Sequence, residues 1–227
     1  MTRVASWAAI PLAVVVWSAG AWAQQPSPSA DPRVRLREGI KRDDLDAGGK
    51  KLYDSIVNAT TPYGRGLPAP IGMWMHSPGM AEHVLPLYMY LRFGGDAGDA
   101  MYFPVRLVEL AILVSAREIN SQYQWTSHEP TARKVGLEPN IIDAVKYRRG
   151  VEGLGEKEAT IILFGRELFR DRCVSASTFT RAQTLFGTAG VTDLAGLMAF
   201  YEFLYLSSNA AFDIQRPPGE TPLLPLP

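Results

Sequence analysis

The segment from Val105 to Val114 most constrains the fold, because apolar side chains occupy almost every position in it. The apolar residues are Val105, Leu107, Val108, Leu110, Ala111, Ile112, Leu113 and Val114. A helix that is apolar on nearly every side has to be buried among other elements. Pro104 immediately precedes the segment and suits the start of a helix. We therefore expect a central buried helix that begins at Pro104.

Helical patterns cover most of the remaining chain, whereas alternating patterns typical of strands are nearly missing. Further helices are predicted from about Lys50 to Val57 and over 77–92, 122–134, 140–149, 156–170, 177–186 and 192–208. A Gly/Pro-rich loop is expected over 61–71. The sequence thus predicts an all-α, single-domain helical bundle.

Several residues are suited to the ends of these helices. Asn140, Ser177 and Thr192 are expected as N-terminal caps, because their side chains can accept hydrogen bonds from free backbone N–H groups. Ser77-Pro78 fits an N-cap followed by a first helical residue. Gly94 is expected to close that helix.

The first 23 residues have the pattern of a secretory signal peptide. Arg3 supplies a positive charge, Val4 to Ala23 contains no charged residue, and Ala21-Trp22-Ala23 fits a small-x-small cleavage site. The uncharged run is long enough to cross a bilayer. Pro11 and the polar stretch after Ala23 favour cleavage over an uncleaved anchor. We expect a periplasmic or secreted protein without stable membrane insertion after removal of the signal.

The predicted order of segments is a signal peptide at 1–23, a flexible leader at 24–44, the helical domain at 45–212 and a Pro-rich tail at 213–227. The balance of 23 basic and 23 acidic residues gives no sign of nucleic-acid binding. The helical segment is long enough for one domain with a sizeable core.

Cysteine and histidine are scarce. Cys173 is the single cysteine, so the chain can form neither an internal disulfide nor a dithiol redox cycle. The three histidines, His76, His83 and His128, are not spaced as metal ligands. We therefore expect no metal and no cofactor.

Glu109 and His128 are the candidate catalytic residues. Burying an ionised carboxylate such as Glu109 inside an apolar helix destabilises the fold by roughly several kcal/mol unless the charge is paired. His128 lies on the following helix, which should fold back against the first, and a buried acid beside an imidazole is suited to proton transfer. A salt bridge from Glu109 to Arg106 or Arg133, with a structural role for His128, is the alternative.

Four segments together resemble the carboxymuconolactone decarboxylase / alkyl hydroperoxidase D-like superfamily. They are Leu52-Tyr-Asp-Ser-Ile-Val, His76-Ser-Pro, Arg106-Leu-Val-Glu-Leu-Ala-Ile-Leu and Tyr123-x-Trp125-x-x-His128. The resemblance extends over nearly all of the chain after Ala23. It implies an all-α bundle of the alkyl hydroperoxidase D-like type that assembles into a homotrimer or homohexamer.

The peroxidase branch of that superfamily uses a glutamate, a Cys-x-x-Cys pair and a histidine. Glu109 and His128 match the glutamate and the histidine, whereas Ser121 and Gln124 fill the two cysteine positions. Without a thiolate there is no nucleophile to attack a peroxide and no disulfide to store the oxidising equivalent. The resemblance therefore favours the decarboxylase branch.

We expect a cofactor-independent decarboxylase or proton-transfer enzyme that acts on a small carboxylated lactone or related acid. His128 would be the general acid/base and Glu109 would orient it or exchange protons with it. The expected substrate-binding residues are Arg106, Ser121, Tyr123, Gln124 and Trp125.

Two alternatives remain open. One is a peroxidase that uses Cys173. The other is a non-catalytic, exported, oligomeric binding protein, in which an arginine would lock Glu109 and no cavity would open beside His128.

Overall fold

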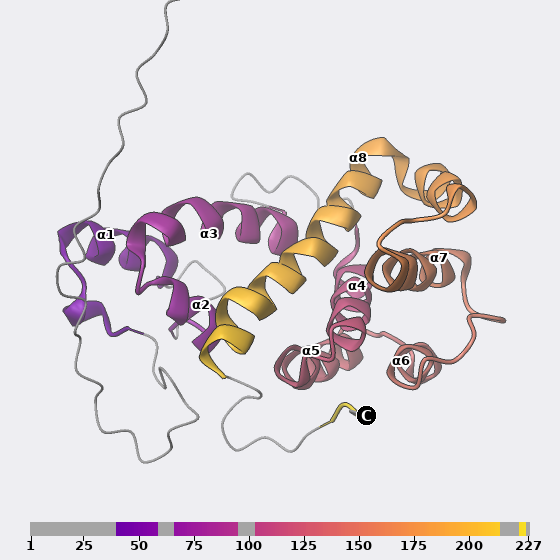
Figure 1. The fold of residues 1–227 in the computed structure, drawn as a ribbon, viewed down its shortest axis with the longest axis horizontal. Helices are drawn as coiled ribbons and strands as arrows, with labels where there is room; N and C mark the ends of the chain where they lie inside the picture. Colours follow the sequence, from indigo (N-terminus) through magenta and orange to yellow (C-terminus); the bar gives the residue numbers. More distant parts are fainter. Residues whose placement is uncertain (1–39, 59–65, 95–102, 214–222, 226–227) are drawn as a thin grey trace, which may run out of the picture. The chain divides into compact units, whose positions relative to one another are not determined.

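The structure is a computed structural model that describes residues 40–58, 66–94, 103–213 and 223–225. The predicted signal peptide, nearly all of the leader and most of the tail lie outside the described residues. The described residues belong to one compact unit. Their regular structure is entirely helical (Figure 1), so the predicted all-α fold is confirmed.

Eight α-helices make up most of the described chain. They are α1 (Ala47–Ile56), α2 (Ala69–Trp74), α3 (Pro78–Phe93), α4 (Val105–Glu118), α5 (Gln122–Lys134), α6 (Pro139–Lys146), α7 (Glu156–Arg166) and α8 (Ala176–Leu204). Three short segments extend or precede them: the 3-10 turn η1 (Arg42–Asp44) and the π-helical turns η2 (Glu167–Asp171) and η3 (Tyr205–Ala210). In the described part of the chain, no helix is long and apolar enough to cross a membrane.

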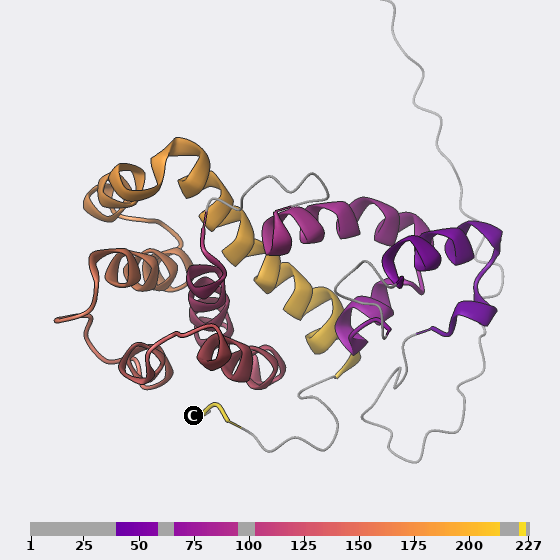
Figure 2. The ribbon, with the colours of Figure 1, turned by 180° about the vertical axis from the view of Figure 1, so that it is seen from behind.

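The helix α4 forms the centre of the core, as its apolar sequence predicts. Every residue from Leu107 to Arg117 is buried. The helices α5, α6, α7 and α8 all contact α4, and Figures 1 and 2 show them gathered around it. Burial of this apolar surface is the main favourable contribution to folding.

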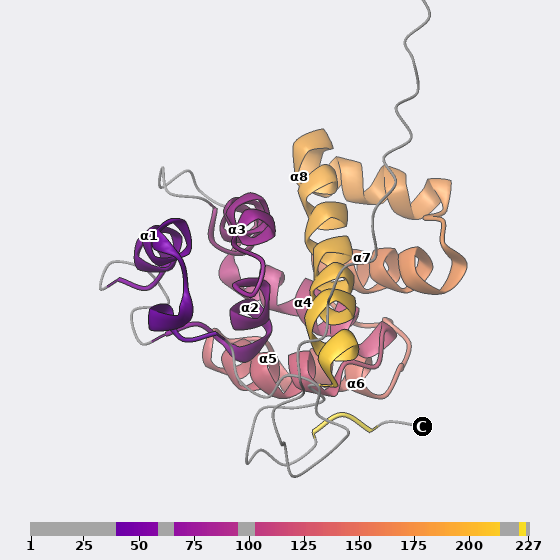
Figure 3. The same cartoon turned by 60° about the vertical axis from the view of Figure 1, so that its left-hand side comes forward.

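The helix α8 joins this centre to the N-terminal helices, because it contacts α3 as well as α4 and α7. Figure 3 shows α8 between α3 and α7. Gly187 has φ 69° and ψ 173°, which breaks the helical path within α8. The sequence predicted two helices here, and the kink at Gly187 is their point of separation.

Three of the predicted caps are wrong by a few residues. Thr192 lies inside α8, where its hydroxyl donates to the carbonyl of Thr188. Ser175 rather than Ser177 caps α8, because Ser175 Oγ accepts from the backbone N–H of Thr178. Asn140 is also not a cap, since α6 begins at Pro139, a residue suited to the first helical position.

The ends of α3 agree with the sequence. Ser77 occupies the N-cap position before Pro78, and Gly94 adopts the left-handed conformation with φ 87° at the C-cap. The helix α2 was not predicted, because it begins inside the segment expected to be a loop. Buried side chains stabilise α2, including Ile71 and Trp74.

The described part of the C-terminal tail packs against the domain. Leu224 is 4% exposed and its backbone N–H donates to Gln122 Oε1 over 3.2 Å. The predicted Pro-rich tail is therefore attached to the start of α5 at this point.

Candidate functional site

Glu109 is the centre of a buried polar cluster that joins α3, α4 and α5. Its side chain has no exposed surface. Glu109 Oε1 accepts a hydrogen bond from Arg92 Nη2, and Glu109 Oε2 lies 2.8 Å from His128 Nδ1. Glu109 and His128 are thus close together, as predicted. The arginine that pairs with Glu109 is Arg92.

The two arginines predicted as alternative partners of Glu109 lie elsewhere. Arg106 forms ion pairs with Glu138 and Glu158 and donates to a backbone carbonyl at the end of α5. Arg133 pairs with Glu129, four residues earlier on α5. The predicted pairing of Glu109 with Arg106 or Arg133 is therefore wrong, and the first turn of α4 is held by other carboxylates.

The hydrogen bonds of His128 assign different roles to its two ring nitrogens. An ionised Glu109 can only accept, so Nδ1 carries the hydrogen in this bond. His128 Nε2 lies 3.3 Å from Tyr201 Oη and, in the neutral ring, accepts from that hydroxyl. A carboxylate, an imidazole and a phenol therefore form one chain of hydrogen bonds. Tyr201 lies on α8, and no sequence pattern indicated its place in the site.

The surroundings keep Glu109 ionised. Burial alone would raise its pKa, but the hydrogen bond and charge of His128, together with the charge of Arg92, hold the pKa below its ordinary value of 4.5. Burial raises the pKa of Tyr201 well above 10, so its phenol remains a hydrogen-bond donor. At neutral pH the cluster thus combines an ionised carboxylate, Glu109, with a protonated phenol, Tyr201.

We expect the free energy of unfolding to fall as pH decreases below about 4.5, because a depressed folded-state pKa adds stability only while the carboxylate is ionised. This contribution is complete above the unfolded-state pKa and is lost as pH falls through the folded-state pKa. Glu129, which is also buried and paired, has a lowered pKa and should act in the same direction. Urea unfolding at several pH values measures the effect, and a constant midpoint between about pH 6 and pH 3 would contradict it.

A cavity of about 670 Å³ lies beside His128. One wall is a single face of α5, formed by Tyr123, Gln124, Ser127, His128, Thr131 and Lys134. The other walls come from α2, α3 and α8 and their flanks, and they contribute Pro68, Pro70, Ile71, Tyr88, Arg92, Phe93 and Leu204. None of these described lining residues is acidic, whereas Arg92 and Lys134 are basic. The cavity is therefore suited to a small anionic molecule.

The structure brings only part of the predicted substrate-binding set to this cavity. Tyr123 and Gln124 line it together with His128. Ser121 is buried and caps α5, where its hydroxyl accepts from the backbone N–H of Gln124. Trp125 has no exposed surface and donates from Nε1 to Glu129, and Arg106 is held by its own ion pairs.

The remaining polar candidates lie away from the cavity. Cys173 is exposed in the turn between η2 and α8 and is not among the described lining residues. His76 and His83 are also exposed. Among the described residues, no group of three His, Cys, Asp or Glu side chains is arranged to hold a metal ion.

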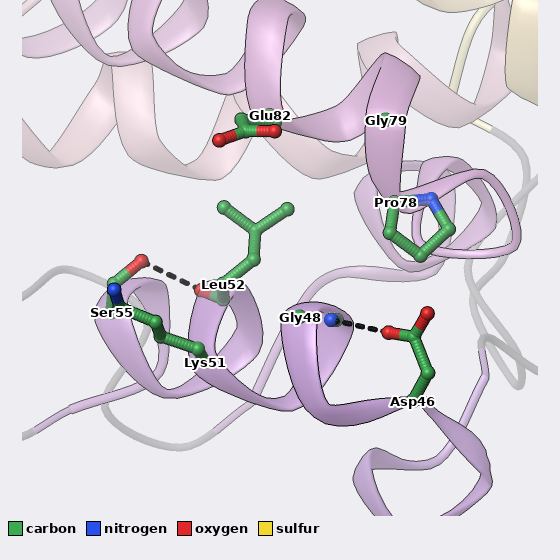
Figure 4. A pocket seen from close by; sticks show the side chains of 9 residues that line it. Asp46, Gly48, Lys51, Leu52, Ser55, Pro78, Gly79 and Glu82 are labelled. Carbon is green, nitrogen blue, oxygen red and sulfur yellow. Dashed lines mark hydrogen bonds between the residues drawn. The ribbon is translucent and has the colours of Figure 1, made fainter.

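A second pocket, of about 390 Å³, lies between α1 and the start of α3 (Figure 4). Asp46 Oδ1 accepts from the backbone N–H of Gly49 and thereby caps α1. The hydroxyl of Ser55 donates to the carbonyl of Leu52. Glu82 lines this pocket from an exposed position on α3. These groups serve helix ends and solvent, so the cavity beside His128 is the stronger candidate site.

In comparisons with known proteins, no protein-family profile and no curated protein matches this chain. Two solved structures are similar, both of the debrominase Bmp8, each with 16% identity and a TM-score of 0.61. One is a cysteine-to-alanine variant in complex with 2,3,4-tribromopyrrole, and the match covers 81% of this chain and 92% of that one. The other is the apo protein, with 84% and 95% covered. The fold is thus shared with an enzyme.

Proposed function

We propose that this protein is a cofactor-independent decarboxylase, or a related proton-transfer enzyme, that acts on a small carboxylated lactone or a similar cyclic acid. One observation carries the proposal: His128 is held at 2.8 Å by the buried carboxylate of Glu109 and also lines a cavity of about 670 Å³. A base oriented in this way beside a pocket is a common arrangement for proton transfer.

The residues of the site have distinct tasks in this reaction. Arg92 and Lys134 attract the substrate carboxylate into a cavity without acidic lining residues. The bond between the carboxyl group and the substrate breaks, CO₂ leaves, and the electron pair stays on the substrate carbon. Protonated His128 then delivers its proton to that carbon and regains a proton from water. Glu109 accepts the Nδ1 hydrogen throughout and stabilises the positive charge of the ring.

The resemblance of the sequence and the shared fold support a small cyclic substrate. The carboxymuconolactone decarboxylase branch acts on a carboxylated lactone, and the debrominase of the same fold is in complex with a brominated pyrrole. Both molecules are compact rings. A carboxylated ring of this size fits a cavity of about 670 Å³ and carries the negative charge that the basic lining favours.

The two alternatives are supported less well. A peroxidase based on Cys173 would place its nucleophile in an exposed turn outside the described cavity lining. A non-catalytic binding protein agrees with the ion pair between Arg92 and Glu109. It does not explain the cavity beside His128, which that alternative was expected to lack.

The proposal is tested by a substrate screen of the purified protein with carboxylated lactones, β-keto acids and hydroperoxides. We expect release of CO₂ from one of the acids, and we expect Cys173→Ser to retain this activity because Cys173 lies outside the site. Peroxide consumption that is lost in Cys173→Ser would favour the peroxidase. Tight binding of acids without any turnover would favour the binding protein.

A further inference from the structure

The side chain of Gln124 contains a buried acceptor that the described chain does not satisfy. Gln124 is 2% exposed, and its Nε2 donates to the backbone carbonyl of Tyr201 over 2.8 Å. Its Oε1 is buried and accepts no hydrogen bond from any described residue. A buried carbonyl without a donor is unfavourable, so such an atom calls for a partner from outside the described residues.

The neighbouring backbone fixes which way the amide of Gln124 faces. The carbonyl of Tyr201 can only accept, so the amino end of Gln124 has to face it. Rotation of the amide would place two acceptors against each other. The other end of the amide is Oε1, which can only accept a hydrogen bond. This atom therefore favours ligands that offer an N–H or O–H group.

Gln124 also occupies the right place on α5 to act together with His128. Gln124, Ser127, His128, Thr131 and Lys134 line the cavity at helical spacings of three and four residues. Gln124 and His128 are four residues apart, so their Cβ atoms are separated by about 6 Å on the same face. A small ring can therefore contact Gln124 while its reacting carbon is near His128.

We infer that Gln124 is a specificity-determining residue, whose Oε1 accepts a hydrogen bond from an N–H or O–H group on the ring of an anionic cyclic acid. This inference rests on the proposed function for the anionic class of substrate, and it adds the hydrogen-bond donor. It assigns a ligand contact to the residue that fills one of the two positions where the peroxidase branch carries cysteine.

The test compares two acids of equal charge and nearly equal shape by calorimetric titration. Pyrrole-2-carboxylate carries a ring N–H, and furan-2-carboxylate carries a ring oxygen in its place. We expect the protein to bind the pyrrole acid about tenfold more tightly, which corresponds to about 1.4 kcal/mol and to one hydrogen bond. N-methylpyrrole-2-carboxylate should bind as weakly as the furan acid.

Two variants locate the source of this preference. Gln124→Met keeps the length of the side chain but removes the acceptor, so the preference for the pyrrole acid should disappear. Thr184→Val, at an exposed position of α8 outside the described cavity lining, should retain it. Equal binding of the two acids by the unaltered protein, binding of neither, or a preference that survives in Gln124→Met would overturn the inference. Because the measurement requires no turnover, its failure is distinct from failure of the proposed reaction, which the substrate screen reports.

Discussion

Replacing Arg92 with methionine is expected to lower the free energy of unfolding by about 3–5 kcal/mol at neutral pH, because the change leaves a buried carboxylate without its arginine partner. Glu109 has no exposed surface, and the side chain of Arg92 is 10% exposed. Methionine retains much of the apolar volume of arginine, so the loss of charge dominates the effect. Urea unfolding monitored by circular dichroism measures it.

The pH dependence of this loss distinguishes charge from packing. Protonation of Glu109 removes the uncompensated negative charge, so Arg92→Met should be less harmful in acid, where this carboxylate takes up a proton, than at neutral pH. The double variant Arg92→Met with Glu109→Gln removes both charges and should recover part of the lost stability. A defect that is the same at every pH would instead indicate lost packing.

Arg172→Met is the matched control for this prediction. Arg172 Nη1 lies 3.3 Å from Glu202 Oε1, but the side chain of Arg172 is 70% exposed. Exposed ion pairs contribute about 0–1 kcal/mol, so this variant should differ little from the unaltered protein. Equal effects of Arg92→Met and Arg172→Met would contradict the view that the buried cluster requires its arginine.

Local sequence patterns predicted most of the fold, because helix burial and helix ends depend on nearby residues. The apolar run after Pro104 predicted α4, and Gly94 marked the end of α3. The cap of α8 was misplaced because Ser175 and Ser177 are chemically equivalent in sequence, and only the backbone geometry selects Ser175. The helix α2 was missed because tertiary packing overcomes its weak local preference.

The site was predictable only where its residues are neighbours along the chain. Glu109 and His128 lie on consecutive helices, which contact each other as the sequence suggested. Arg92 and Tyr201 come from α3 and α8, and their approach depends on how distant helices pack. Ser127, Thr131 and Lys134 also line the cavity, and the sequence did not indicate that this face of α5 borders one.

Substitution of His128 with alanine is expected to reduce the rate of turnover by about 10²–10⁴-fold, the usual contribution of a general acid/base. The fold should survive, because Glu109 keeps its ion pair with Arg92 and the side chain of His128 is already 16% exposed. The measurement is kcat on whichever acid the substrate screen identifies, with circular dichroism as the check on folding. His83→Ala is the matched control, since His83 is exposed on α3 and is not among the lining residues.

Rescue by added imidazole separates a chemical role of His128 from a structural one. The alanine variant leaves space beside a cavity of about 670 Å³. Free imidazole can therefore enter and take the place of the His128 ring next to Glu109. We expect imidazole to restore part of the activity of His128→Ala but not of His128→Phe, whose ring fills the space without a proton to exchange. The rescued rate should follow the concentration of imidazolium if His128 acts as the acid that protonates the substrate carbon. Full activity of His128→Ala without imidazole would show that the proton comes from another group.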